Sequence, residues 1–97
     1  MLKKAKPRLG ASVADAASFA RKQPDIPVSG AYVGKVRSGS PADKAGLHKG
    51  DVITALGGQP IILVDDLYNL AAQVPQGRDI SLTYVRDGRA HDTLIRL

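Results

Sequence analysis

Several residue types are missing from this sequence, and each absence excludes a class of protein. The 97 residues contain no cysteine, which excludes disulfide bonds and cysteine-ligated metal sites. They contain no tryptophan and one phenylalanine, and no aromatic residues gather among the basic ones, so a surface that stacks nucleic-acid bases is hard to build. No apolar run approaches the roughly 20 residues of a membrane span, and residues 1–4 lack the apolar stretch of a signal peptide. We therefore expect no nucleic-acid partner, and no membrane span or targeting segment in this chain.

What is present is typical of one small globular domain. Hydrophobic residues make up 43% and charged residues 24%, which argues against disorder and against a fibrous chain. The formal net charge of +5 comes partly from Lys3, Lys4, Lys6 and Arg8. Such a segment can bind phosphates or an anionic membrane, but a solvated linker is the simpler interpretation. We predict that residues 1–7 are a linker or an end added for expression, and that residues 8–97 form the domain.

The clearest pattern runs from residue 38 to residue 56, where it predicts a turn, a short helix, a second turn and a strand. Ser40 is typical of a helix N-cap, and Pro41 suits the first helical position, where its missing N–H is not needed. Gly46 suits the left-handed residue that ends a helix, and a second turn then leads into the apolar run 52–56. Because none of these side chains is arranged for chemistry, the segment predicts structure rather than catalysis.

This segment, continued into the glycine turn at 57–58 and the Pro-Ile beyond it, resembles the signature of bacterial PDZ domains from HtrA/Deg-type serine proteases. The shared pattern is Ser-Pro-Ala, a short helix ending Ala-Gly-Leu, then Gly-Asp-Val-Ile, a glycine turn and Pro-Ile, and it runs unbroken through residues 40–61. The resemblance implies a small α+β fold over residues 8–97. This fold is a partly open antiparallel β-barrel or sandwich, capped by two or three helices, in the bacterial, circularly permuted strand order.

Periodicity and turn residues predict the other elements of this fold. The expected strands cover residues 8–13, 31–37, 52–56, 80–85 and 90–97, with a brief edge segment at 60–62, and the longer expected helices cover residues 15–22 and 64–74. Asp15 is expected at the start of the first of these helices, where an acid matches the helix macrodipole. The alternation in 31–37 is imperfect and leaves open which of its faces is buried.

The segment Arg8-Leu9-Gly10-Ala11 resembles the loop with which PDZ domains bind the carboxylate at the end of a peptide ligand. A tight loop with glycine can turn several N–H groups toward one carboxylate, which makes a backbone nest. Arg8 adds attraction for that charge, although the small Ala11 leaves the depth of the terminal pocket open. In a PDZ-like domain the peptide then adds as an antiparallel strand to a sheet edge, here expected along Ala11, Ser12 and Val13.

The helix expected at 64–74 supplies the opposite wall of this groove. Val64, Tyr68 and Ala71 share one helical face, which we assign to the groove, and a neighbouring face that carries Leu67, Leu70 and Val74 is assigned to the core. An alternative interpretation places Val64 and Ala71 in the core as well. In eukaryotic PDZ scaffolds a histidine opens this helix and selects a ligand hydroxyl. Because Val64 stands at that position, we expect apolar or aromatic residues near the ligand's C-terminus, with Tyr68 stacking on them.

No constellation of residues in the sequence predicts catalysis, a cofactor or a metal. His48 falls in a structural turn and His91 on the last strand, so both are expected at the surface. The segment 38–40 resembles no nucleophile elbow or protease serine loop. Asp65 and Asp66 diverge by about 100° around a helix, and the helix macrodipole accounts for both. There is no phosphate-binding loop and no cluster with metal-ligand spacing, so we expect no enzyme activity from this chain.

The resemblance implies a peptide-binding domain of an HtrA/Deg-like (DegP-like) serine endopeptidase. Such a domain recognises C-termini or unfolded segments of proteins for a protease domain in the same polypeptide. It works in the periplasm or elsewhere outside the bacterial cytoplasm, in protein quality control. An alternative is an assembly or scaffold module of a secretion or membrane-protease protein, with its groove filled by a neighbouring domain. Peptide binding by a free groove separates the first function from the second.

Overall fold

The structure is a computed structural model and describes residues 9–24, 26–75 and 77–97. The predicted linker at residues 1–7 and the site residue Arg8 lie outside the described residues. The strands are β1 (Ala11–Asp15), β2 (Ala31–Val36), β3 (Val52–Leu56), β4 (Gln59–Pro60), β5 (Asp79–Arg86) and β6 (Arg89–Arg96). The helices are α1 (Ala17–Ala20), α2 (Pro41–Lys44) and α3 (Val64–Gln73).

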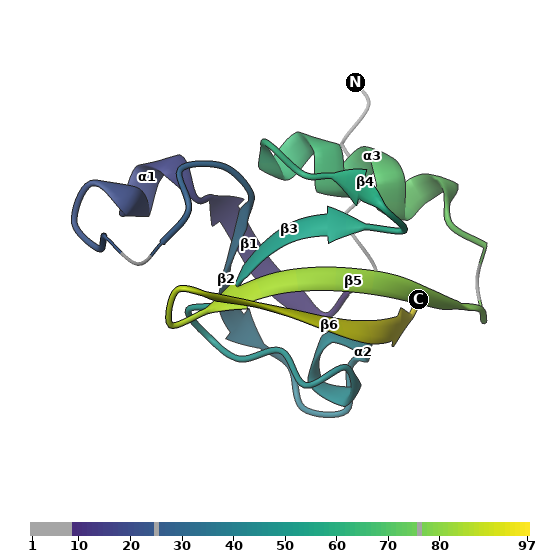
Figure 1. Ribbon diagram of the computed structural model, residues 1–97. Helices are drawn as coiled ribbons and strands as arrows, with labels where there is room; N and C mark the ends of the chain where they lie inside the picture. Colours follow the sequence, from purple (N-terminus) through teal and green to yellow (C-terminus); the bar gives the residue numbers. More distant parts are fainter. Residues whose placement is uncertain (1–8, 25, 76) are drawn as a thin grey trace, which may run out of the picture.

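The strands form one antiparallel sheet in the order β1-β2-β3-β5-β6, with the short β4 paired to β3 beside this path. The sheet does not close, so within the described part β1 and β6 are its two edges. Figure 1 shows α3 and β4 at the top of the molecule, α2 at the bottom and α1 to the left. This open antiparallel α+β architecture confirms the predicted fold class.

One hydrophobic core lies between the sheet and the helices, because the inward side chains of nearly every element converge there. Its buried members are Leu9, Ala31, Val33, Ala42, Leu47, Ile53, Leu56, Ile61, Leu67, Leu82, Tyr84 and Ile95. A smaller cluster under α1 joins Ala16, Ile26 and Val52, and here the rings of Phe19 and Tyr32 stack with their centroids 3.9 Å apart. The two clusters cover both faces of the sheet at β2.

The turn and helix around α2 follow the sequence pattern closely. The Oγ atom of Ser40 accepts a hydrogen bond from the Asp43 amide at 3.2 Å, and Pro41 is the first helical residue. The Asp43 carboxylate accepts from the Gly39 amide at 2.8 Å, which closes the preceding turn. Gly46 ends the segment with a φ of +88°, the left-handed conformation for which glycine is suited. The predicted cap, start and end of this helix are therefore confirmed.

The first strand and the first helix differ from their predictions. β1 begins at Ala11 rather than at residue 8 and continues through Asp15, and α1 is a single turn instead of a helix over 15–22. Asp15 pairs with Ala31 of β2, and the Ala16 amide donates to the Gly30 carbonyl at 2.9 Å. Pairing with β2 thus outweighs the weak helical preference of this segment. The Asp15 carboxylate serves a different helix, because it accepts from the Val64 amide of α3.

A partly buried ion pair, which the sequence analysis did not predict, joins Asp51 before β3 to Arg86 at the end of β5. The Asp51 side chain is buried and accepts from Nε and Nη2 of Arg86 at 2.8 and 2.7 Å. Nη2 also donates to the Gly46 carbonyl at 2.8 Å, and Asp51 accepts from the His48 amide. The hydrogen bond to Asp51 raises the pKa of the Arg86 guanidinium above its ordinary value, against the opposing effect of burial.

Candidate functional site

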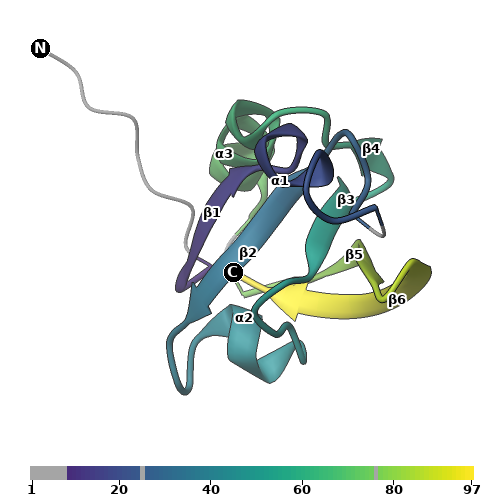
Figure 2. The same cartoon turned by 90° about the vertical axis from the view of Figure 1, so that its left-hand side faces the viewer.

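The free edge of β1 lies beside α3, and this is where the sequence places a peptide-binding groove. In the described part β1 pairs with β2 alone, and α3 contacts both of these strands. Figure 2 shows β1 at the margin of the sheet with α3 beyond its upper end. The two predicted walls of the groove are therefore brought together by the fold.

Alternate residues of β1 hydrogen-bond to β2, and the residues between them turn their backbone groups outward. The Ala16 amide donates to the Gly30 carbonyl, and in an antiparallel ladder hydrogen-bonded pairs alternate with non-bonded ones. The backbone groups of Val13 and Asp15 therefore point away from β2, toward the open edge. At the other end the Arg37 amide donates to the Gly10 carbonyl at 2.8 Å, so Ala11 faces outward too. The edge thus offers a pairing group at every second residue, as an added strand requires.

The loop that leads into β1 is held from behind by α2. Gly10 has a φ of +75°, and a Cβ at this position would overlap the Cβ of Ser40. The Leu9 carbonyl accepts from the Ala42 amide at 2.9 Å, and the Leu9 side chain is fully buried in the core. Among the described residues, the amides of Leu9 and Gly10 have no acceptor. The loop is therefore fixed by the Leu9 side chain and by its carbonyls, while two of its N–H groups donate to no other described residue.

The predicted groove face of α3 is exposed unevenly. Val64 and Tyr68 are half-buried, whereas Ala71 is only 2% exposed and lies among the buried residues, as does Leu67. The alternative interpretation in which Ala71 belongs to the core agrees with this burial. Val64 packs partly against the core cluster. Tyr68 is thus the largest side chain on this face that retains contact with solvent.

Asp15 connects the two walls of the site, and the sequence analysis did not identify it as a site residue. Its Oδ1 accepts from the backbone amide of Val64 at 2.7 Å, so the first turn of α3 is attached to the last residue of β1. A carboxylate at this end of a helix also interacts favourably with the helix macrodipole. The two residues are 49 positions apart, and no local pattern links them.

Ser12 lies on the opposite face of β1 from the groove. Its Oγ accepts a hydrogen bond from the Lys35 amide of β2 at 2.8 Å, at a point where the register between the two strands shifts. The Ala11 and Val13 side chains pack against the core cluster instead. Of the three predicted edge residues, Ala11 and Val13 therefore face α3, and the Ser12 side chain completes the hydrogen bonding of the sheet.

At the start of α3 the Asp66 carboxylate accepts from the Leu63 amide at 2.9 Å and from the Ile62 amide at 3.0 Å. These hydrogen bonds, that from Leu63 most of all, lower the pKa of Asp66 below its ordinary value. The Asp66 carboxylate thus fixes the backbone of Ile62 and Leu63, directly before the helix. Asp66 is one of the two acids predicted in this first turn.

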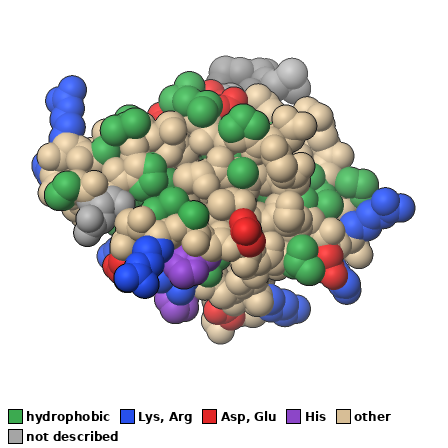
Figure 3. All heavy atoms as spheres, in the orientation of Figure 1, with side chains coloured by type: hydrophobic (Ala, Val, Ile, Leu, Met, Phe, Trp, Pro, Cys, Tyr) green, Lys and Arg blue, Asp and Glu red, His purple; other side chains and the backbone are tan. Residues whose placement is uncertain are grey.

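The remaining candidates for chemistry lie apart from the groove. His48 and His91 are both exposed, and the His91 ring stacks on Tyr84 at 5.3 Å between centroids. A hollow of about 500 Å³ beside His48 is lined by Lys22, Lys49 and Arg86, among others. On the face shown in Figure 3, Lys and Arg side chains lie around the periphery and hydrophobic ones are interspersed.

The described residues contain no group of three or more side chains that could hold a metal ion. No helix among them is long and apolar enough to cross a membrane.

Comparison with known proteins identifies the fold. The family model described as "PDZ domain" matches residues 7–97. The chain belongs to the PDZ domain family. A relative from Haemophilus influenzae, named "Probable periplasmic serine protease do/HhoA-like", is 46% identical over 70% of this chain. A relative from Neisseria meningitidis serogroup A, whose name is that of a zinc metalloprotease, is 49% identical over 65% of this chain. Several further relatives carry DegP-like serine endoprotease names.

Two solved structures from HtrA proteins share the fold of this PDZ domain. The HtrA-type protease AlgW, solved with a decapeptide, has a TM-score of 0.79 at 27% identity, over 91% of this chain and 27% of its own. The HtrA3 PDZ domain, bound to a phage-derived ligand (FGRWV), has a TM-score of 0.75 at 23% identity, over 94% of this chain and 84% of its own. The comparisons therefore show a PDZ domain that is similar to those of HtrA/Deg-like serine proteases.

The PDZ domain spans about 15% of the length of the Haemophilus relative and 14% of the Neisseria one. It does not contain the catalytic domain of those proteases.

Proposed function

We propose that this PDZ domain binds the C-terminal segment of a polypeptide, which adds to the free edge of β1 as an antiparallel strand. The observation that carries the proposal is the edge itself, where Ala11, Val13 and Asp15 turn backbone groups outward at every second residue. Main-chain pairing of this kind gives affinity that depends little on the ligand sequence. The peptide ligands of AlgW and of the HtrA3 PDZ domain support the same class of ligand here.

The terminal carboxylate of the ligand would lie at the amides of Leu9, Gly10 and Ala11. Amides that point at one anion form a nest, and hydrogen bonds to a charged group are stronger than neutral ones. The positive charge of Arg8 adds attraction, which we place at less than about 1 kcal/mol.

The ligand side chains that face α3 meet Val64 and Tyr68. An apolar or aromatic residue is preferred there, because the aromatic ring of Tyr68 and the branched side chain of Val64 provide an apolar wall. Ala71 lies deeper than these two residues, since it is only 2% exposed.

The relatives support a role for this domain in a longer parent protein. We propose that the PDZ domain presents C-termini or unfolded segments of substrates to a serine protease domain in the same polypeptide. The periplasmic protease names of the relatives support this role and a location outside the cytoplasm.

The test is a titration of the ¹⁵N-labelled protein with a synthetic peptide that ends in apolar residues, alongside the same peptide with an amidated C-terminus. We expect shifts of the amides of residues 9–13 and 64–71. Amidation should weaken binding about ten-fold or more, because charge-assisted hydrogen bonds contribute about 1.5–3 kcal/mol. Equal binding of both peptides, or shifts elsewhere, would overturn the proposal.

A variant pair tests the helix wall. Tyr68→Ala should weaken binding of the apolar peptide several-fold, whereas Leu94→Ala, which removes an exposed side chain from β6 at the other edge of the sheet, should not. Equal affinity for peptides that end in charged residues would contradict the apolar preference.

A further inference from the structure

A β-bulge places one lysine on the outer face of the sheet, beside the edge where the peptide would bind. Ala11 pairs with Val36 and Val13 pairs with Val33, so the two residues Gly34 and Lys35 stand opposite the single residue Ser12. Such a bulge turns side chains of the bulged strand toward one face and re-aims them. Val36, Ala11 and Val13 pack against the core, and Lys35 is exposed. Lys35 therefore projects from the face opposite to α3.

Among the residues that the structure describes, the small Ser12 stands between Lys35 and the open edge of β1. A Cβ on Gly34 would meet the Ser12 Oγ at 2.6 Å, which shows that Ser12 covers Gly34 on this face. Ser12 itself is small, and its hydroxyl is already engaged by the Lys35 amide. A strand added to β1 would lie two strand spacings from β2, about 10 Å away. The flexible four-carbon stem of lysine and a glutamate on the ligand can span this distance together.

The position of the ligand side chain follows from the pairing. Ala11 and Val13 have outward backbone groups and side chains toward α3, so the ligand residues opposite them also point toward α3. With the carboxylate at Leu9–Ala11, these are the last and the third-last residues. The penultimate residue is opposite Ser12 and points to the outer face. It is the ligand side chain that Lys35 can reach.

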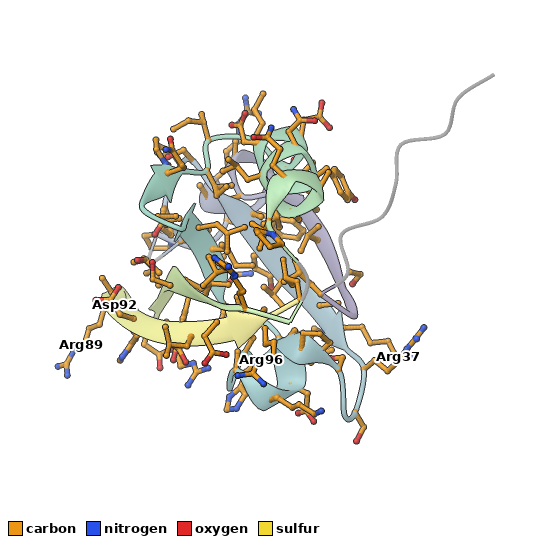
Figure 4. The ribbon with its side chains drawn as sticks, turned by 90° about the vertical axis from the view of Figure 1, so that its right-hand side faces the viewer. Arg37, Arg89, Asp92 and Arg96 are labelled. Carbon is orange, nitrogen blue, oxygen red and sulfur yellow. The ribbon has the colours of Figure 1, made fainter. Side chains whose placement is uncertain are left out.

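Two cations, Lys35 and Arg37, are exposed along the outer face of β2 and just beyond its end. Neither of them forms an ion pair with another described residue. Several aspartates of the chain are occupied elsewhere, Asp15 by α3, Asp43 by the turn before α2 and Asp51 by Arg86. Arg37 projects from the end of β2 beside the carboxylate loop, and Figure 4 shows it on the opposite side of the molecule from Arg89.

We infer that this domain selects ligands with an acidic residue immediately before the C-terminal residue. Lys35 pairs with this carboxylate across Ser12, and Arg37 adds to the positive field at the C-terminal end of the groove. The inference rests on the proposed mode of peptide addition. The class of ligand is therefore a C-terminus that is apolar at its last residue and acidic at the residue before it.

The experiment compares three synthetic peptides that differ only in the penultimate residue, which is Glu, Gln or Lys, by isothermal titration at low and high salt. Against the unmodified domain, the Glu peptide should bind about three-fold tighter than the Gln peptide, as expected of an exposed ion pair, and the Lys peptide should bind more weakly than both. The preference should shrink at high salt, because exposed charges are screened.

Two variants complete the design. Lys35→Ala should abolish the difference between the Glu and Gln peptides, and Lys35→Arg should retain it. Arg89→Ala removes one positive charge at the far end of the molecule and should leave the difference intact. If all three peptides bind equally to the unmodified domain, the inference is overturned while the proposed function stands. If none of them binds, both are overturned.

Discussion

At Gly10 the backbone conformation and the packing of the loop both demand glycine. Its φ is +75°, and an added Cβ would overlap the Cβ of the buried Ser40 and lie 2.8 Å from its Oγ. We expect Gly10→Ala to lower the free energy of unfolding by about 3 kcal/mol, the sum of left-handed strain and overpacking. Peptide affinity should fall as well, because the clash moves the amides that we propose bind the ligand carboxylate. Urea unfolding and peptide titration measure the two effects.

Gly39→Ala is the matched control for this substitution. Gly39 has a similar φ of +78°, but an added Cβ there would meet nothing within 4 Å. This variant should lose only about 1–2 kcal/mol of stability from backbone strain and keep its peptide affinity. If the two variants behave alike, the contact between Gly10 and Ser40 does not shape the loop.

At the scale of one element, the start of α3 depends on an ionised carboxylate. The pKa of Asp66 is lowered by the hydrogen bonds from the Leu63 and Ile62 amides, so folding favours the charged form. A group whose pKa is lower in the folded state stabilises the protein above its unfolded pKa, near 3.8, and this contribution is lost as pH falls through the folded pKa. Between about pH 5 and pH 2 the unmodified protein should therefore lose more stability than Asp66→Asn.

The measurement is the urea midpoint at a series of pH values. The control is Asp87→Asn, which removes a carboxylate from the turn between β5 and β6, outside the helix. This variant should follow the pH dependence of the unmodified protein more closely than Asp66→Asn does. An identical pH dependence in Asp66→Asn and the unmodified protein would mean that the two amides do not depend on the charge of Asp66.

The elements that could be predicted from the sequence are those whose signals are local. α2 has its cap, its proline and its terminal glycine within a few residues, and α3 has helical periodicity, so both were located correctly. Asp15 and Asp51 could not be assigned, because their partners lie 49 and 35 residues away. The imperfect alternation over residues 31–37 is explained by the bulge at Gly34 and Lys35. A strand pattern does not reveal such a shift until its partner's register is known.

The candidate site also has parts with local sequence signals and parts that depend on distant contacts. The resemblance predicts the position of its loop, since Leu9, Gly10 and Ala11 are contiguous in the sequence, and ligand binding at this loop stays a prediction. The hydrogen bond from the Lys35 amide to the Ser12 Oγ depends on how β2 pairs with β1. The burial of Ala71 depends on how α3 packs, and helical spacing alone left the role of Ala71 open.

For the whole molecule, the predicted boundary of the domain can be tested by deleting residues 1–7. The described contacts begin at Leu9, which is buried and whose carbonyl accepts from the Ala42 amide. We therefore expect the deletion to leave the urea midpoint and the peptide affinity at about 0.15 M salt unchanged. It removes Lys3, Lys4 and Lys6 and so lowers the formal net charge from +5 by three. The deletion variant should associate more slowly with the acidic peptide, but only at low salt. The lost lysine charges attract the peptide over a long range, and this attraction raises the encounter rate.

Stopped-flow association rates across a salt series separate the effect of charge from that of the chain. A full-length variant with Gln in place of the same three lysines is the control. If it reproduces the slower association of the deletion variant, the segment acts through its charge alone. If the deletion lowers the urea midpoint while the Gln variant does not, residues before Arg8 contribute contacts to the fold, and the domain begins earlier than predicted.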